Sequence, residues 1–234
     1  MKLRAVTFDA GGTLLYPHPS VGEIYAAAAR RHGASVSAEA METAFREAWR
    51  ACHHPEVAGK AGNVSQREWW RDMVFQTLEL AGVRLRDRAA YFEELYHLFA
   101  HATVWRLFPD ARETLTAVRQ RGLKTGLLSN WDHRLRQVLE ELRLMPLLDA
   151  VVISCEVGVE KPHPAIFDAA RTALGVGDPR EVIHVGDSYR DDVLGATAVG
   201  MRAVLMERGG PGHWSGPTIR ELAELIRLLD NGDF

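Results

Sequence analysis

The chain has 234 residues, and its 28 basic and 31 acidic side chains give a net charge of −3 at pH 7. Hydrophobic residues make up 47% of it and charged residues 25%, proportions that argue against disordered and fibrous classes. The near-neutral charge gives no reason to expect a nucleic acid or a membrane surface as a partner. Two cysteines cannot build a disulfide framework. No apolar run approaches the roughly 18 residues of a membrane span, so we expect a cytoplasmic protein with reduced thiols.

The first predicted element is a strand at 3–8, a short apolar run that ends at Asp9. The stretch that follows, 18–103, contains no convincing strand and has apolar residues at helical spacing. Within it, helices are predicted at 21–32, 38–50, 65–81 and 89–101. We therefore expect an all-helical cap domain at 18–103. Its insertion after the first strand would place it at the carboxyl edge of a sheet, where ligands bind in open α/β folds.

From residue 104 onward, short apolar runs alternate with helical patterns. Asp110 is expected to cap a helix, Pro164 opens a second one, and a last helix is predicted at 218–229. The apolar runs between them predict strands at 123–129, 150–154, 181–185 and 202–206. They alternate only partly, as strands buried on both faces of a parallel sheet do. The pattern predicts an α/β fold, with a Rossmann-like, doubly wound parallel sheet in a core domain at 1–17 and 104–234.

Two of the predicted strands end in residues suited to binding an anion. Asp9 leads into Ala10-Gly11-Gly12-Thr13, a tight turn in which a ligand can approach backbone amides. Ser129 and Asn130 end the strand at 123–129, and their hydroxyl and amide groups can hydrogen-bond a phosphate oxygen. Taken alone, each sequence has an ordinary explanation, because aspartate, serine and asparagine also cap turns and helices.

Two further sites follow later strands. Lys161-Pro162 precedes a helix, where a fixed ammonium can bind an anion, although surface lysines are usually only solvated. Asp187 follows the strand at 181–185, and Asp191 and Asp192 come near the start of the next helix. Carboxylates there can hold a hard cation such as Mg²⁺, whereas acidic residues at a helix start are favourable even without a metal. That second explanation does not require Asp187, so this cluster is the strongest of the four signals.

Together the four sites resemble the four motifs of the haloacid dehalogenase superfamily of hydrolases, and the resemblance covers nearly the whole core. It implies a phosphatase-like hydrolase with a helical cap, in which Asp9 attacks phosphorus and forms an aspartyl-phosphate. It also implies a catalytic role for Lys161. Substrate phosphate would contact Gly12, Thr13, Ser129, Asn130 and Lys161. Mg²⁺ would involve Asp9, the Gly11 carbonyl, Asp187 and Asp192, with Asp192, or less favourably Asp191, supporting the metal or Lys161 from behind.

The turn after Asp9 departs from that pattern at one position. Phosphatases of the superfamily usually carry a second aspartate two residues after the nucleophile, where it protonates the leaving oxygen, and here that residue is Gly11. Such acid–base assistance is worth about 10²–10⁴-fold in rate. A phosphatase without it is expected to be slow, to favour good leaving groups or to borrow another donor. Candidate donors are Tyr16, His18 and His53-His54, with His18 the first choice because histidine titrates near neutrality.

Two alternatives follow from the same departure. Dehalogenases of the superfamily also lack the acid, because a halide leaves without a proton, and their first motif shares part of Asp9-Ala10-Gly11-Gly12-Thr13. They do not need Mg²⁺, however, and Asp187 with Asp192 has the metal-binding pattern, so we favour a phosphatase. The other alternative is a catalytically weakened phosphate-binding or regulatory protein. We expect Mg²⁺ as cofactor, a small phosphorylated metabolite as substrate, and a monomer or homodimer.

Overall fold

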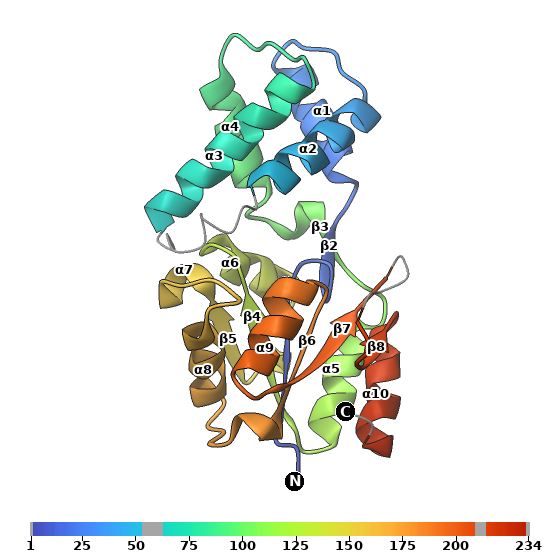
Figure 1. Cartoon of the computed structure of the whole chain (residues 1–234). Coiled ribbons are helices and arrows are strands. Elements are labelled where there is room, and N and C mark those ends of the chain that lie inside the picture. The colour runs from blue at the N-terminus through green and yellow to red at the C-terminus, as the bar shows by residue number, and fades with distance from the viewer. Residues whose placement is uncertain (1, 53–62, 209–213, 233–234) are drawn as a thin grey trace.

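The computed structural model describes residues 2–52, 63–208 and 214–232. Its main feature is a sheet of 6 parallel strands in the order β5-β4-β1-β6-β7-β8 (Figure 1). The strands are β1 (Ala5–Phe8), β4 (Lys124–Ser129), β5 (Ala150–Ile153), β6 (Val182–Gly186), β7 (Arg202–Met206) and β8 (Thr218–Ile219). This arrangement confirms the predicted Rossmann-like α/β fold, and it places β1 at the centre, between β4 and β6.

Helices cover both faces of this sheet, with one apolar core on each side. Val6 and Phe8 of β1 belong to the core that includes α5 and α10, whereas Ala5 belongs to the core that includes α8 and α9. Burial on both faces explains why the strand sequences alternate only partly. The core helices are α5 (Ala111–Gln120), α6 (Arg134–Glu141), α7 (Ser154–Val157), α8 (Pro164–Ala173), the π-helix η5 (Tyr189–Leu194), α9 (Gly195–Ala198) and α10 (Leu222–Asn231), with 3₁₀ turns at Ala102–Val104, Met145–Leu147 and Pro179–Glu181.

A bundle of helices stands above the carboxyl end of the sheet (Figure 1). The chain enters this bundle after β2 (Leu15–Pro17) and leaves it before β3 (Trp105–Leu107), and these two strands pair antiparallel. A two-stranded hairpin therefore carries the whole bundle. Its helices, which contact one another in pairs, are α1 (Val21–Arg31), α2 (Ala38–Cys52), α3 (Asn63–Leu80) and α4 (Arg88–Leu98).

Two local predictions near the carboxyl terminus and α5 are wrong. Thr218 does not begin the last helix, because Thr218 and the β-branched Ile219 pair with β7 as β8, and α10 begins at Leu222. Asp110 precedes α5 but makes no side-chain capping bond to that helix. Its Oδ2 instead accepts the backbone N–H of Leu222 at 2.6 Å. Asp110 therefore joins the start of α10 to the start of α5, two helices that pack on the same face of the sheet.

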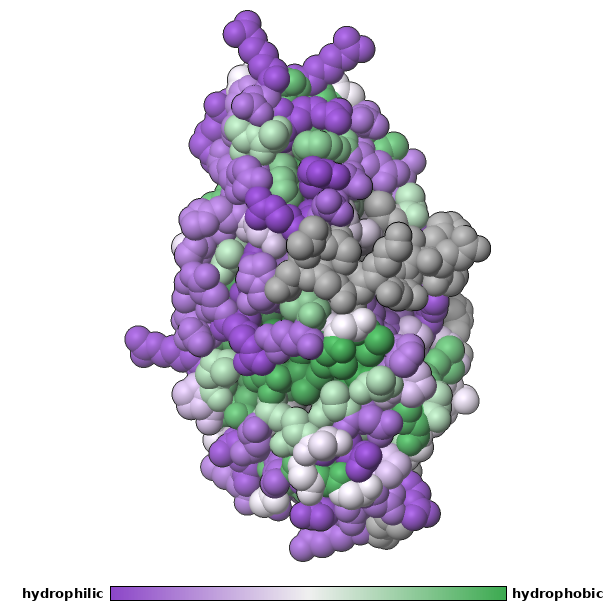
Figure 2. Space-filling model, turned by 90° about the vertical axis from the view of Figure 1, so that its left-hand side faces the viewer, coloured by the Kyte–Doolittle hydropathy of each residue, from purple (hydrophilic) through white to green (hydrophobic). Residues whose placement is uncertain are grey.

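The surface differs between the two ends of the molecule. In the face shown in Figure 2, hydrophilic residues dominate the outer end of the bundle, and hydrophobic residues gather in a band across the core domain below it. Across the described ranges, none of the helices combines the length and the apolar character that crossing a membrane requires.

Candidate active site

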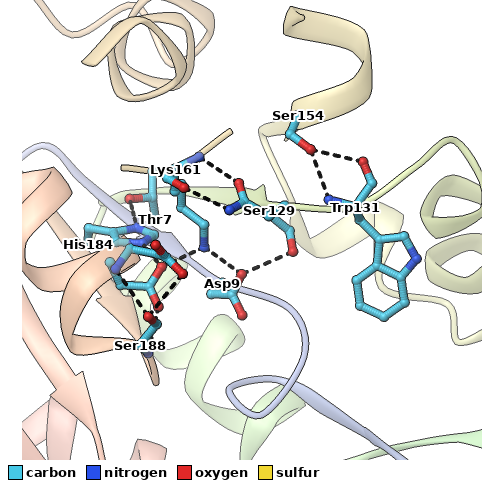
Figure 3. A network of polar contacts seen from close by, with 11 residues as sticks. Thr7, Asp9, Ser129, Trp131, Ser154, Lys161, His184 and Ser188 are labelled. Atoms are coloured by element: carbon cyan, nitrogen blue, oxygen red, sulfur yellow. Dashed lines mark hydrogen bonds and ion pairs between the residues drawn. The ribbon is translucent and has the colours of Figure 1, made fainter. Parts of the chain in front are cut away.

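Asp9 stands at the carboxyl end of the central strand. Its backbone N–H donates to Val185 O of β6 at 2.8 Å, so the chain turns out of the sheet only after this residue. Asp9 is 7% exposed. Lys161 Nζ donates to Asp9 Oδ1 at 2.6 Å, and Ser129 Oγ donates to the same oxygen at 3.0 Å (Figure 3). Three residues that follow different strands therefore meet at one carboxylate oxygen.

Lys161 lies between two buried carboxylates. Its ammonium donates to Asp9 Oδ1 and, at 2.5 Å, to Asp192 Oδ1. Burial alone would lower the pKa of this ammonium, but the charges of Asp192 and Asp9 raise the pKa above its usual value. Burial raises the pKa of Asp9, an effect that the charge of Lys161 only partly offsets. The site therefore holds a permanent positive charge directly against the carboxylate of Asp9.

Asn130 fixes the backbone around Lys161. Its Nδ2 donates to Lys161 O at 2.9 Å, and its Oδ1 accepts from Lys161 N at 2.7 Å. Both ends of the side-chain amide are thus used within the chain. The structure gives Asn130 a positioning task at Lys161, and its predicted phosphate contact stays a prediction.

Asp192 is anchored from the interior of the sheet by His184, a functional neighbour that was not among the predicted site residues. His184 is fully buried in β6, and its Nε2 lies 2.9 Å from Asp192 Oδ1 (Figure 3). A carboxylate only accepts, so this ring nitrogen donates. Nδ1 lies 2.9 Å from Thr7 Oγ1, and the backbone N–H of Ser188 donates to Asp192 Oδ2 at 2.9 Å. Burial raises the pKa of Asp192, but Lys161 and His184 lower it below its usual value.

Asp9, Asp187 and Asp192 each offer a carboxylate oxygen, and these oxygens lie within 4.8 Å of one another. Both oxygens of Asp192 already accept hydrogen bonds, whereas Asp187 is exposed at the open side of the group. Although the residue as a whole is exposed, the protein atoms around its carboxyl group desolvate that group and raise its pKa to about 7, and the charges of Asp9 and Asp192 add to this effect. This concentration of negative charge suits a hard divalent cation, with Asp9 and Asp187 best placed to offer oxygen ligands.

The turn after Asp9 is closed by its own backbone. Gly12 has a φ of +77°, and a Cβ there would lie 2.2 Å from Asp187 Oδ2, so a glycine lets Asp187 approach the turn. The Gly12 N–H donates to Leu15 O at 2.9 Å. Thr13 is fully buried, and its carbonyl accepts from Arg208 Nη2 at 3.0 Å. The structure therefore uses the backbone of Gly12 and Thr13 to shape the turn, and their predicted phosphate contacts stay predictions.

Gly11 is bordered by an aromatic ring. A Cβ at Gly11 would lie 3.5 Å from Cζ3 of Trp131, an ordinary van der Waals contact. Ser154 Oγ accepts the Trp131 N–H and donates to Trp131 O, each at 3.1 Å, and so fixes the backbone of this residue (Figure 3). The rings of Trp131 and Trp105 have centroids 5.0 Å apart. The structure therefore puts Trp131 beside the turn that follows Asp9.

Within the part of the chain that the structure describes, the proposed substitute donors make no contact with Asp9. His18 is exposed, its backbone N–H donates to Val104 O at 2.9 Å, and its ring centroid lies 6.3 Å from that of Tyr16. These contacts hold His18 at the outer end of the hairpin, because β2 leads the chain toward the bundle. His53-His54 lies outside the described residues. The geometry therefore does not support His18 as the proton donor.

The bundle contacts the core beside this site through α3 and α4. Gln66 Nε2 donates to Glu160 Oε1 at 2.7 Å. Burial raises the pKa of Glu160. Asp132 and Arg134 form a buried ion pair with an Nη2–Oδ2 distance of 2.8 Å, and the guanidinium lies 3.8 Å from the ring centroid of Tyr96. These contacts hold the two helices over the carboxyl end of the sheet.

Known proteins share this architecture. A family model described as haloacid dehalogenase-like hydrolase matches residues 3–200. The chain is 39% identical to haloacid dehalogenase-like hydrolase domain-containing protein 3 of Homo sapiens, over 98% of this chain and 95% of that protein. Two solved structures are similar: a HAD phosphatase from Thermococcus onnurineus (28% identity, 97% and 98% of the two chains, TM-score 0.69) and a dehalogenase with intermediate complex (26%, 97% and 97%, TM-score 0.75). The chain therefore belongs to the haloacid dehalogenase-like hydrolases.

Proposed function

We propose that the protein is a Mg²⁺-dependent phosphatase that hydrolyses a small phosphorylated metabolite through Asp9. The observation that carries this proposal is the grouping of Asp9, Asp187 and Asp192 within 4.8 Å, next to the ammonium of Lys161. A phosphoryl group is a multiply charged anion, and its transfer depends mainly on positive charge held in place around it. A fixed ammonium beside carboxylates that suit a cation supplies such charge. Similarity to a solved HAD phosphatase supports the same reaction class.

The chain's own residues account for the main steps. Lys161 and Ser129 bind Oδ1 of Asp9, so Oδ2 is the oxygen that attacks phosphorus. As this bond forms, the bond from phosphorus to the leaving oxygen breaks, and its electron pair departs with that oxygen. Lys161 and Ser129 then stabilise the phosphoryl oxygens of the aspartyl-phosphate. Attack by water on the same phosphorus releases inorganic phosphate and restores the carboxylate of Asp9.

The residues present fit Mg²⁺, which prefers oxygen ligands. Asp9 and Asp187 would hold it through carboxylate oxygens, and Gly11 through its backbone carbonyl. When bound, the ion supplies positive charge that offsets the charge developing on the phosphoryl oxygens. Asp192 acts mainly on Lys161, because the ammonium already donates to its Oδ1.

In this proposal, residues 18–103 form a cap that selects the substrate, and 1–17 with 104–234 form the catalytic core. The Gln66–Glu160 hydrogen bond joins the two at the residue before Lys161. A cap that separates from the core at such contacts can admit a metabolite and then exclude water. We further propose that the enzyme works in the cytoplasm as a monomer or homodimer.

A second candidate function is removal of halide from a 2-haloacid. Gly11 favours it, because Asp9 would displace a halide from carbon and a halide needs no proton to leave. The similarity to a solved dehalogenase at 26% identity points in the same direction. The carboxylate group with Asp187 favours the phosphatase, since a cation site has no task in halide displacement.

Phosphate release from p-nitrophenyl phosphate and a panel of sugar and nucleotide phosphates tests the proposal. The native protein should turn over with Mg²⁺ and stop with chelator, and Asp9→Asn should be inactive because an amide is a poor nucleophile. Metal-independent halide release from a 2-haloacid would instead establish the dehalogenase. Calorimetric binding of phosphate without turnover of any substrate would identify a binding protein.

A further inference from the structure

The side of the site that faces the bundle is built from aromatic rings. In-line attack by Asp9 sends the leaving group away from the sheet, toward the bundle above the carboxyl end of β1 (Figure 1). Trp131 borders this side, because its ring lies 3.5 Å from the position of a Cβ on Gly11. The ring centroids of Trp131 and Trp105 are 5.0 Å apart, and those of Trp105 and Phe99 are 5.7 Å apart. Trp131 is therefore the ring beside Gly11, and the buried Trp105 and then Phe99 pack behind it.

Acidic groups on this side are engaged by other residues. Asp132 is fully buried and accepts from both Nε and Nη2 of Arg134, which balances its charge. Glu160 accepts the amide of Gln66 at 2.7 Å. His18 is exposed at the hairpin. Asp187 lies on the other, cation-binding side of Asp9, where the proposed Mg²⁺ would take up its carboxylate. On the side of Trp131, these described residues therefore offer no unengaged carboxylic acid or imidazole to the departing oxygen.

We propose that Trp131 is a specificity-determining residue that selects phosphate esters of flat, acidic hydroxyl compounds such as phenols and enols. This inference rests on the proposed phosphatase function. The bond from Asp9 Oδ2 to phosphorus forms while the bond from phosphorus to the aryl or enol oxygen breaks. The electron pair stays on that oxygen, which departs as an unprotonated anion and takes its proton later from water.

Two physical effects make this class fit the site. An oxyanion whose charge spreads into a ring is a stable leaving group, so it needs none of the acid assistance that an alkoxide requires. The flat ring can also stack on the indole of Trp131, which Ser154 and Trp105 hold in place. A sugar or glycerol leaving group would gain neither effect.

The decisive experiment measures kcat/KM for a series of aryl phosphates, from acidic nitrophenols to phenol, together with glycerol phosphate, all with Mg²⁺. We expect kcat/KM to fall steeply as the leaving group becomes more basic, with glycerol phosphate about 10²–10⁴-fold slower than the best aryl ester. Equal rates for aryl and alkyl esters would overturn the inference and leave the phosphatase proposal intact. Absence of turnover with every phosphate would overturn both.

Three variants sharpen this result. Trp131→Ala should raise KM for aryl phosphates about three- to tenfold, the size of one aromatic contact, and Trp131→Phe should recover most of the loss. An unchanged KM in Trp131→Ala would show that the indole does not touch the leaving group. Glu160→Gln tests the carboxyl group that Gln66 binds: a shallow dependence on the leaving group in the native protein that becomes steep in this variant would identify Glu160 as an acid and overturn the inference.

Discussion

The two sides of Asp9 differ in chemistry. On the sheet side, Lys161, Asp192 and His184 are buried, and their polar atoms bind one another in a continuous chain. On the bundle side lie rings such as Trp131, and the Gln66–Glu160 hydrogen bond is one of the polar contacts between the bundle and the core. A satisfied buried network holds its charges in place without reorganising, whereas a few apolar and polar contacts separate at little cost. Under the proposed function, this difference assigns the reaction to the sheet side and the choice of substrate to the bundle side.

The largest effect should come from removing the buried ammonium of Lys161 on the sheet side of Asp9. Lys161→Met leaves Asp9 and Asp192 buried without the ammonium between them, and loss of one partner in a buried ion pair costs about 3–5 kcal/mol. We expect that loss in urea unfolding, together with loss of phosphate release. Lys124→Met is the control, since this exposed lysine only donates to Leu174 O, and it should change stability by about 1 kcal/mol or less. Equal destabilisation by both variants would contradict the assigned network.

The next largest effect is expected at Asp187, the exposed carboxylate of the group around Asp9. Its pKa of about 7 in the folded protein lies above that of an unfolded chain, so without metal its contribution to stability grows as pH falls below 7 and is lost as pH rises. Mg²⁺ competes with this proton and should stabilise the fold most above pH 7, by about 2.7 kcal/mol at 100 times its Kd. Thermal unfolding at pH 6 and 8 should show both effects in the native protein. A Mg²⁺ response that persists in Asp187→Asn would place the cation elsewhere.

A smaller effect is expected deeper in the sheet, at His184. His184→Leu removes the donor to Asp192 Oδ1 and should lower kcat about 10- to 100-fold with little change in KM, as loss of a supporting group typically does. His184→Gln keeps an N–H near the position of Nε2 and should recover most of kcat. If both variants lose activity equally while remaining folded, the histidine matters for packing and not for its hydrogen bond.

The smallest effect is expected on the bundle side. Gln66→Ala removes one hydrogen bond between the bundle and Glu160, so KM should rise about two- to tenfold while kcat changes little. Glu68→Ala, at an exposed neighbouring position, is the control and should leave KM unchanged. A fall in kcat without a change in KM would contradict the assignment of substrate binding to the bundle side and of the reaction to the sheet side.

The sequence was sufficient to predict which of the site residues meet at one edge of the sheet. Asp9, Ser129, Lys161 and Asp187 each follow an apolar run, and the carboxyl ends of parallel strands meet at one edge of a sheet. Because strand period and turn residues are local properties, this convergence could be predicted before any contact was known. The approximate bounds of the main strands follow from the same signal.

Partners within the site could not be predicted in the same way. Thr7 lies opposite His184 through the register between β1 and β6, which no local pattern encodes. Asn130 has the same composition and spacing whether it faces a phosphate or the backbone of Lys161. Asp110 has a capping position before one helix, yet it bonds to Leu222 at the start of another. In each case the choice depends on which distant segment packs nearby.

The hairpin that carries the bundle has an evolutionary consequence. Leu15 pairs with Leu107 and Pro17 with Trp105, so the chain leaves the core and returns to it at adjacent points. When the two ends are already held together, lengthening the segment between them costs only about 0.6 kcal/mol per doubling. Residues between these strands can therefore be inserted, deleted or exchanged as a module, because the sequence that forms the sheet lies outside this segment. Under the proposed function, selection can thus change the substrate of such a hydrolase through mutations in one uninterrupted stretch of the gene.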